Sequence, residues 1–150
     1  THAGWANITE MPASDDVFTF INTKEPAKQT MYEGSQTVDG VTYTNAISTG
    51  GGCDSKNAIS FIVPENSTAI LTLVASCGGG SDRWIAVDTQ ISKSTANETL
   101  LYHNFVYATE DYNASKLVSA ELQPGTYYIN FSNGVRIFAA ELKITSVVLS

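Results

Sequence analysis

The chain has 150 residues and a formal net charge of −7, and 15% of its residues are charged. This acidic balance argues against a nucleic-acid partner, because no basic stripe is present to displace counterions from phosphates. No apolar run approaches the roughly 20 residues that cross a membrane as a helix. The length suits a single domain over residues 1–150, with room for a hydrophobic core.

Short apolar runs bounded by turn residues recur along the chain, and this pattern is typical of β-strands. Asp39-Gly40 predicts a turn into the second run, residues 90–99 indicate a long polar loop, and residues 108–116 could form one short helical turn. In chain order the runs cover residues 17–21, 41–47, 58–63, 67–75, 83–87, 100–107, 116–122, 127–131 and 135–144.

Two cysteines lie in a mirrored glycine frame, Gly-Gly-Gly-Cys53 and Cys77-Gly-Gly-Gly. If the runs between them form a hairpin about residues 64–66, Cys53 lies opposite Cys77. Opposed residues in an antiparallel pair are about 4.5–5.5 Å apart, which a disulfide can span. The pattern therefore predicts a Cys53–Cys77 disulfide and a secreted, extracellular protein. Two buried free thiols are the alternative, and a metal site is disfavoured because no second Cys or His lies nearby in sequence.

Asn133-Gly134 is a strong two-residue hairpin signal. It predicts that the last two runs pair, with Phe131 opposite Arg136 and Ile129 opposite Phe138. Within the final run, residues 138, 140, 142 and 144 share one apolar face. Runs of this kind with turns about every ten residues predict an all-β, antiparallel β-sandwich, jelly-roll-like in its connectivity.

Motifs for catalysis are missing, so we expect no catalytic residues. His2 is terminal and expected to be loose, and His103 has no Gly-x-Ser-x-Gly element to accompany it. The adjacent acids Asp15-Asp16 and Glu110-Asp111 are more typical of solvated turns than of a catalytic pair.

A structural calcium ion is the one cofactor that the sequence suggests, and none is required. Aspartates at predicted strand ends could combine with loop carbonyls into an oxygen cage. The alternative is that Asp is simply a favoured turn residue. These aspartates are Asp15, Asp16, Asp39, Asp54, Asp82 and Asp88.

A sandwich with aromatic, amide and basic side chains on its surface has the chemistry of sugar binding. Aromatic rings stack on sugar C–H groups, amides pair with hydroxyls, and cations pair with the carboxylates of uronates. Arg83 is in phase with Ile85 and Val87 and could instead be structural, while Trp84 could be a core residue. The candidate carbohydrate-binding residues are Lys56, Arg83, Trp84, Tyr102, Tyr107 and Arg136. Whether a sheet face or the loop rim binds stays open.

The order of several segments resembles the β-sandwich carbohydrate-binding modules attached to bacterial pectate lyases and other plant cell-wall enzymes, and in particular the pectin-binding modules of family 77. The likeness covers about residues 30–145. The segments that carry it are residues 37–44, 50–52, 59–63, 69–73, 83–87 and 122–129.

This resemblance implies a non-catalytic module that holds a parent enzyme, in the same chain, on plant cell-wall polysaccharide. Lysines or arginines would meet galacturonate carboxylates, and Arg83 occupies a recurrent position. Because −7 is an unfavourable charge for a polyanion binder, a neutral β-glucan or hemicellulose stays open as the ligand. A structural or adhesin-like sandwich that binds a protein, and a small calcium-dependent lyase or hydrolase, are the rival hypotheses.

Overall fold

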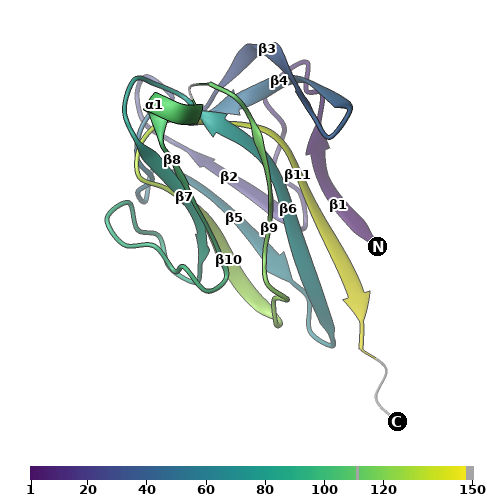
Figure 1. The fold of residues 1–150 in the computed structure, drawn as a ribbon. Helices are drawn as coiled ribbons and strands as arrows, with labels where there is room; N and C mark the ends of the chain where they lie inside the picture. The colour runs from purple at the N-terminus through teal and green to yellow at the C-terminus, as the bar shows by residue number, and fades with distance from the viewer. Residues whose placement is uncertain (111, 148–150) are drawn as a thin grey trace.

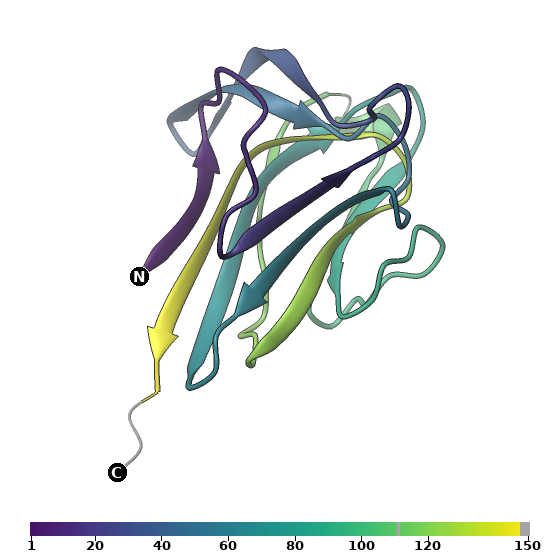
Figure 2. The ribbon, with the colours of Figure 1, turned by 180° about the vertical axis from the view of Figure 1, so that it is seen from behind.

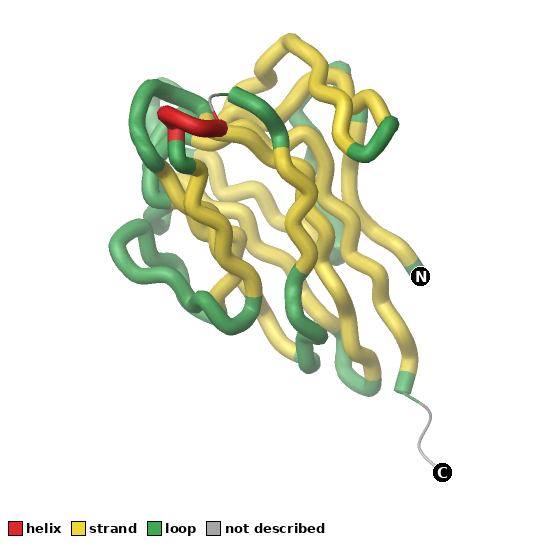
Figure 3. The backbone as a smooth tube through the Cα atoms, viewed as in Figure 1, coloured by secondary structure: helices red, strands yellow, loops and turns green. Residues whose placement is uncertain are grey.

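The computed structural model describes residues 1–110 and 112–147, and it is built almost entirely from β-strands (Figure 1). A single turn of helix, α1 (Tyr107–Glu110), appears in red in Figure 3 and falls at the start of the predicted helical turn. In the described part of the chain no helix has the length and apolar character needed to cross a membrane. The strands are β1 (His2–Ala6), β2 (Phe18–Asn22), β3 (Thr30–Val38), β4 (Val41–Ser48), β5 (Asn57–Val63), β6 (Ser67–Cys77), β7 (Arg83–Asp88), β8 (Leu101–Phe105), β9 (Ser115–Val118), β10 (Gly125–Phe131) and β11 (Val135–Ser146).

The strands form two antiparallel sheets that pack face to face, which confirms the predicted sandwich. Sheet A has the order β3-β4-β11-β6-β9, with β1 paired to the later part of β11, and sheet B has the order β2-β5-β10-β7-β8. Figure 2 shows β2, β5 and β10 of sheet B side by side, with sheet A behind them. Alternate side chains from both sheets fill the space between the layers, including Phe18, Phe61, Phe105 and Phe131 of sheet B and Leu71, Leu73, Ile137 and Leu142 of sheet A.

Both hairpins predicted from the apolar runs are wrong. β5 lies in sheet B and β6 in sheet A, so residues 64–66 cross from one layer to the other. The Asn133-Gly134 turn crosses in the same way between β10 and β11. In each case the two strands turn their apolar residues toward each other across the core, instead of pairing edge to edge. The predicted turn at Asp39-Gly40 does join two paired strands, β3 and β4, with φ of 51° and 79° at its two residues.

The predicted Cys53–Cys77 disulfide is also wrong, because it depended on the first of these hairpins. Both cysteines are free and buried. The Cys53 thiol donates to the carbonyl oxygen of Ser92 at 3.2 Å, and the Cys77 thiol donates to that of Gly79 at 3.0 Å. Burial raises the pKa of the Cys53 thiol above its ordinary value, so the group stays protonated and remains a donor.

A β-bulge in β11 changes the face that its middle residues occupy. The register with β6 shifts between Ile137 and Ala139. Ile137, Ala140 and Leu142 therefore point into the principal core, whereas Phe138 packs in a second cluster with Ala46 and Val74. The predicted common face of residues 138, 140, 142 and 144 is interrupted for this reason, since a bulge inserts one residue into the alternation.

Two strands were not predicted. β1 includes His2, which pairs with Lys143 of β11 and is not loose as expected. β3 is rich in polar residues and contains Gly34, so its alternation is weak. Both strands are held by pairing with an apolar neighbour, β11 for β1 and β4 for β3, and their own patterns carry little strand signal.

Candidate functional site

Three glycine segments meet at one end of the sandwich. They are residues 50–52, 78–80 and the turn at 133–134. The Gly78 amide donates to the Gly134 carbonyl oxygen at 3.1 Å, and a Cβ on Gly78 would lie 2.7 Å from that oxygen. This close approach requires glycine at position 78. The antiparallel registers bring the start of β7 and the start of β5 to the same end.

At this end of the sandwich, the Arg83 side chain forms hydrogen bonds with other parts of the chain. Its Nη1 donates to the Gly134 carbonyl oxygen at 2.7 Å and its Nε to the Ser81 hydroxyl at 3.3 Å. These bonds agree with the structural alternative raised for this residue and use part of its five-donor guanidinium. A role for Arg83 in ligand binding stays a prediction.

Lys56, Arg136 and Tyr107 lie in different places. Lys56 is exposed in the turn before β5, and its neighbour Asp54 is paired with Lys24 at 2.6 Å, which lowers the pKa of Asp54. The Arg136 guanidinium carbon lies 3.8 Å from the ring centre of Tyr32 and 4.9 Å from that of Tyr112, on the outer side of sheet A.

Tyr107 is half-buried at the start of α1, and its ring meets the Tyr112 ring edge-on, with 5.6 Å between centres. The structure therefore places Arg136 on sheet A, away from Trp84 and Tyr102, whereas Tyr107 follows β8 directly and Lys56 lies at the end of sheet B where β7 begins.

Trp84 and Tyr102 together form an aromatic platform. They lie on neighbouring strands β7 and β8, with ring centres 6.4 Å apart and planes inclined by 36°. Ile85 and Val87 point into the core, so the platform lies on the outer face of sheet B. Tyr102 is 38% exposed, and Asn104 stands opposite Trp84 in the strand register. The arrangement offers two adjacent rings with an amide beside them.

The loop of residues 89–100 folds back against this part of the molecule. The Asn130 amide donates to the Gln90 carbonyl oxygen at 2.7 Å, and the Cys53 thiol holds the carbonyl of Ser92. The next residue of the loop, Lys93, lies against Gly52. A Cβ atom added to Gly52 would lie 3.0 Å from the Cδ atom of Lys93.

Lys93 is thereby brought near the part of β7 that carries Trp84. A Cβ on Gly52 would also lie 2.8 Å from the Ser132 carbonyl oxygen. Ser132 in turn exchanges two hydrogen bonds with Trp84, at 2.9 and 3.1 Å. Reasoning from the sequence missed Lys93, because nothing local places a residue of a long polar loop beside β7.

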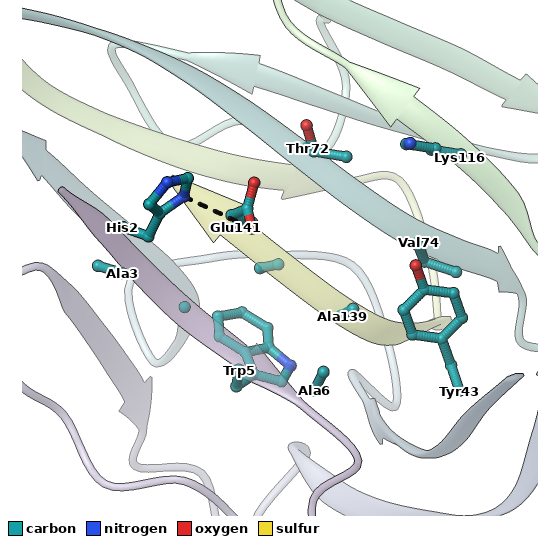
Figure 4. A pocket seen from close by; sticks show the side chains of 12 residues that line it. His2, Ala3, Trp5, Ala6, Tyr43, Thr72, Val74, Lys116, Ala139 and Glu141 are labelled. Atoms are coloured by element: carbon teal, nitrogen blue, oxygen red, sulfur yellow. Dashed lines mark ion pairs between the residues drawn. The ribbon is translucent and has the colours of Figure 1, made fainter. Parts of the chain in front are cut away.

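A separate groove of about 460 Å³ crosses the outer face of sheet A (Figure 4). Its wall includes Tyr43 from β4, Lys116 from β9, and the pair His2 and Glu141, whose Nδ1 and Oε2 are 3.6 Å apart. None of these side chains was a candidate from the sequence. The groove could not be predicted from the sequence, because β1 forms one of its sides and has only a weak strand signal.

The aspartates proposed for calcium serve mainly as turn and loop acceptors. Asp15 Oδ1 accepts from the Val17 and Phe18 amides, and Asp82 Oδ1 accepts from the Tyr107 amide at 3.0 Å. Over residues 1–110 and 112–147 no group of three or more His, Cys, Asp or Glu side chains could hold a metal ion. Asp111 of the adjacent acid pair lies outside the described residues.

Neither a protein family nor a curated protein sequence matches the chain. A solved structure described as "The complexity of the Ruminococcus flavefaciens cellulosome reflects an expansion in glycan recognition" has a similar fold. The match covers 100% of this chain and 97% of that chain, with a TM-score of 0.56 and 16% sequence identity. At this identity the likeness shows a shared fold.

Proposed function

We propose that the chain is a non-catalytic carbohydrate-binding module that acts outside the cell and targets an appended enzyme to plant cell-wall polysaccharide. The observation that carries this proposal is the aromatic platform of Trp84 and Tyr102 on the outer face of sheet B. The fold shared with a protein described in the context of glycan recognition supports it. The scaffold is jelly-roll-like, since strands β4 to β11 alternate as β4-β11-β6-β9 and β5-β10-β7-β8.

The chemistry of the platform suits sugar rings. Aromatic faces contact the C–H groups of a pyranose, and the Asn104 amide can pair with hydroxyls. Lys93 supplies a cation on the loop beside β7, and Lys56 supplies another at the same end of the sheet. Pectin, as homogalacturonan, is therefore the favoured ligand, because its carboxylates can pair with these lysines. Neutral β-glucans are the second choice.

Affinity electrophoresis through gels that contain homogalacturonan, xyloglucan or glucomannan, together with a cellulose pull-down, tests this proposal. We expect homogalacturonan to retard the protein at low salt, and less so at high salt because exposed charges are screened. Trp84→Ala should remove the retardation, whereas Tyr112→Ala, at an aromatic residue near sheet A, should retain it. The proposal is overturned if no gel retards the protein and cellulose does not bind it, or if Trp84→Ala is retarded as strongly as the parent chain.

A second candidate function is that of a structural or adhesin-like sandwich that binds a protein. It is favoured by exposed apolar side chains at the β9 edge of sheet A, where Val118 is 58% exposed and Ile70 of the neighbouring strand is 39% exposed. A protein partner would then bind an apolar sheet edge. Loss of partner binding in Val118→Asp, combined with no glycan binding by the parent chain, would favour this candidate.

A further inference from the structure

We propose that the groove on sheet A is a second, independent site, and that it binds a neutral, linear oligosaccharide. The inference rests on the proposed function only for the general class of ligand. The groove lies on the outer face of sheet A and the aromatic platform on the outer face of sheet B, so one short chain cannot occupy both. The module would then hold two glycan chains at once.

The strand registers place two rows of side chains across the groove. One row consists of short apolar side chains, with Ala6, Ala139 and Val74 in line. The next row is more polar, with Gly4, Glu141 and Thr72 in line. Both rows cross from β1 through β11 to β6 and reach β9, and four strands span roughly 14 Å between their axes.

This pairing of rows matches a pyranose chain. A sugar ring has an apolar C–H face and a rim of hydroxyls, so the apolar row can contact the face. At the rim, the Glu141 carboxylate can accept hydrogen bonds and the Thr72 hydroxyl can donate or accept them. Small side chains in the floor allow a flat ring to approach the sheet. Tyr43, half-buried on β4, lies beside Val74 and Ala139 of the apolar row, where it can stack on a sugar ring (Figure 4).

The charges of the groove select a neutral ligand. Lys116 is exposed and has no ion-pair partner among the described residues, while Glu141 brings one negative charge. His2 carries a charge only when it is protonated. A polyuronate would gain one contact with Lys116 and meet repulsion from Glu141, whereas hydroxyls can bind both side chains.

A peptide is a poorer occupant. Peptides that bind sheets gain main-chain hydrogen bonds at a strand edge. The groove crosses the face of sheet A, where the inner strands β11 and β6 have already paired their backbone groups with their neighbours. Only a few side chains are available there to hold an extended ligand, and these suit hydroxyl groups.

Titration of the whole ¹⁵N-labelled chain with cellohexaose, xylohexaose, mannohexaose and hexagalacturonate, followed by NMR, tests the proposal. At least one neutral hexasaccharide should shift the amides of Gly4, Thr72 and Ala139, with an affinity that hardly changes between low and high salt. Tyr43→Ala should weaken this binding about tenfold, the scale of one lost aromatic contact. Thr72→Arg should block it by filling the groove, and Lys143→Ala, outside the lining, should leave it unchanged.

The outcomes separate the two proposals. If Trp84→Ala abolishes every binding event and the groove amides never shift, the groove proposal fails and the proposed function stands. Binding that survives Trp84→Ala and is lost in Tyr43→Ala supports the groove and removes the platform. A groove that binds hexagalacturonate in preference to the neutral sugars contradicts the ligand class. If none of the four sugars shifts the groove amides or the amides of β7 and β8 around the platform, both proposals are overturned.

Discussion

Arg83 shows how one side chain can satisfy a pattern for binding and still serve the fold. It opens β7 in phase with two core residues, and its guanidinium reaches the Gly134 carbonyl at 2.7 Å. That bond joins the start of β7 to the turn between β10 and β11. Through this bond Arg83 can hold the loops around the platform in place, whether or not it also contacts a ligand.

Replacing Arg83 separates these roles. Arg83→Met should lower the free energy of unfolding by about 1–3 kcal/mol, because the Gly134 carbonyl in a buried turn loses its charged donor. Chemical denaturation measures this change. The exposed control Lys56→Met should shift stability by no more than about 0.5 kcal/mol. An unchanged stability in Arg83→Met, together with a large loss of affinity for homogalacturonan, would instead assign Arg83 to the ligand.

The two thiols give a second prediction at the scale of single residues. Because both are buried, Ellman's reagent should not react with the folded protein, and it should titrate two thiols in denaturant without any reductant. Dithiothreitol should leave the stability unchanged. A denatured, unreduced sample with no reactive thiol would restore the disulfide that the structure contradicts.

The raised pKa of Cys53 also predicts a dependence of stability on pH. Below the ordinary thiol value of 9.0 both the folded and the unfolded chain carry a neutral thiol, so its contribution to stability is fully present. As the pH rises above that value the unfolded chain ionises first, and stability decreases until the pH passes the raised folded value. Denaturation midpoints between pH 8 and 10.5 should fall less in Cys53→Ser than in the parent chain, because a serine hydroxyl does not titrate in that range.

At the scale of the elements, β11 is the strand that organises sheet A. It pairs with β6 along its whole length on one side, and with β4 and then β1 on the other. The bulge after Ile137 turns Phe138 outward beneath β3 and β4, where it meets the Tyr32 ring edge-on with 6.3 Å between centres. The second apolar cluster thus adds side-chain packing to the β4–β11 pairing that attaches the β3–β4 hairpin to the sandwich.

Truncation of Phe138 tests this packing. The side chain is 1% exposed, so Phe138→Ala should lower the free energy of unfolding by about 3–5 kcal/mol through lost burial and an unfilled cavity. Val118→Ala, at a position that is 58% exposed, is the control and should change stability by less than about 0.5 kcal/mol. If the two variants unfold at the same denaturant concentration, the hairpin is not anchored through Phe138.

For the whole molecule, the net charge of −7 opposes binding of a polyanion, and local cations must compensate for it. Electrostatic interactions between exposed groups fade over a Debye length of about 8–10 Å, so a lysine beside the platform acts more strongly than distant acids. Lys93 is the candidate for this role, because loop 89–100 places it against Gly52, next to Ser132, which pairs with Trp84.

Lys93→Met should therefore weaken homogalacturonan binding by about two- to fivefold at low salt, the range expected for one exposed ion pair. The difference from the parent chain should shrink at high salt, and binding of neutral oligosaccharides should be unaffected. Isothermal titration at two salt concentrations gives both comparisons. Equal losses for charged and neutral ligands would mean that Lys93 acts by holding the loop.

Much of the strand content could be predicted from local patterns, and both platform residues were among the candidates named from the sequence. Period-two alternation marked β2, β4 to β7, β10 and β11, and it separated Trp84 from the inward-facing Ile85. Such alternation predicts which side chains point into the core, because successive residues on a strand point to opposite faces. Turn residues at Asp39-Gly40 likewise specified a tight reversal of the chain.

Which strands pair with each other was decided by the tertiary structure. Two strands with inward apolar faces can pair side by side or face each other across a core, and the alternation is the same in both cases. This ambiguity produced the false hairpins at residues 64–66 and 133–134, and with them the false disulfide. The pairing of β7 with β8, the fold of Lys93 onto Gly52 and the groove beside β1 all depend on contacts between distant segments, which no local pattern encodes.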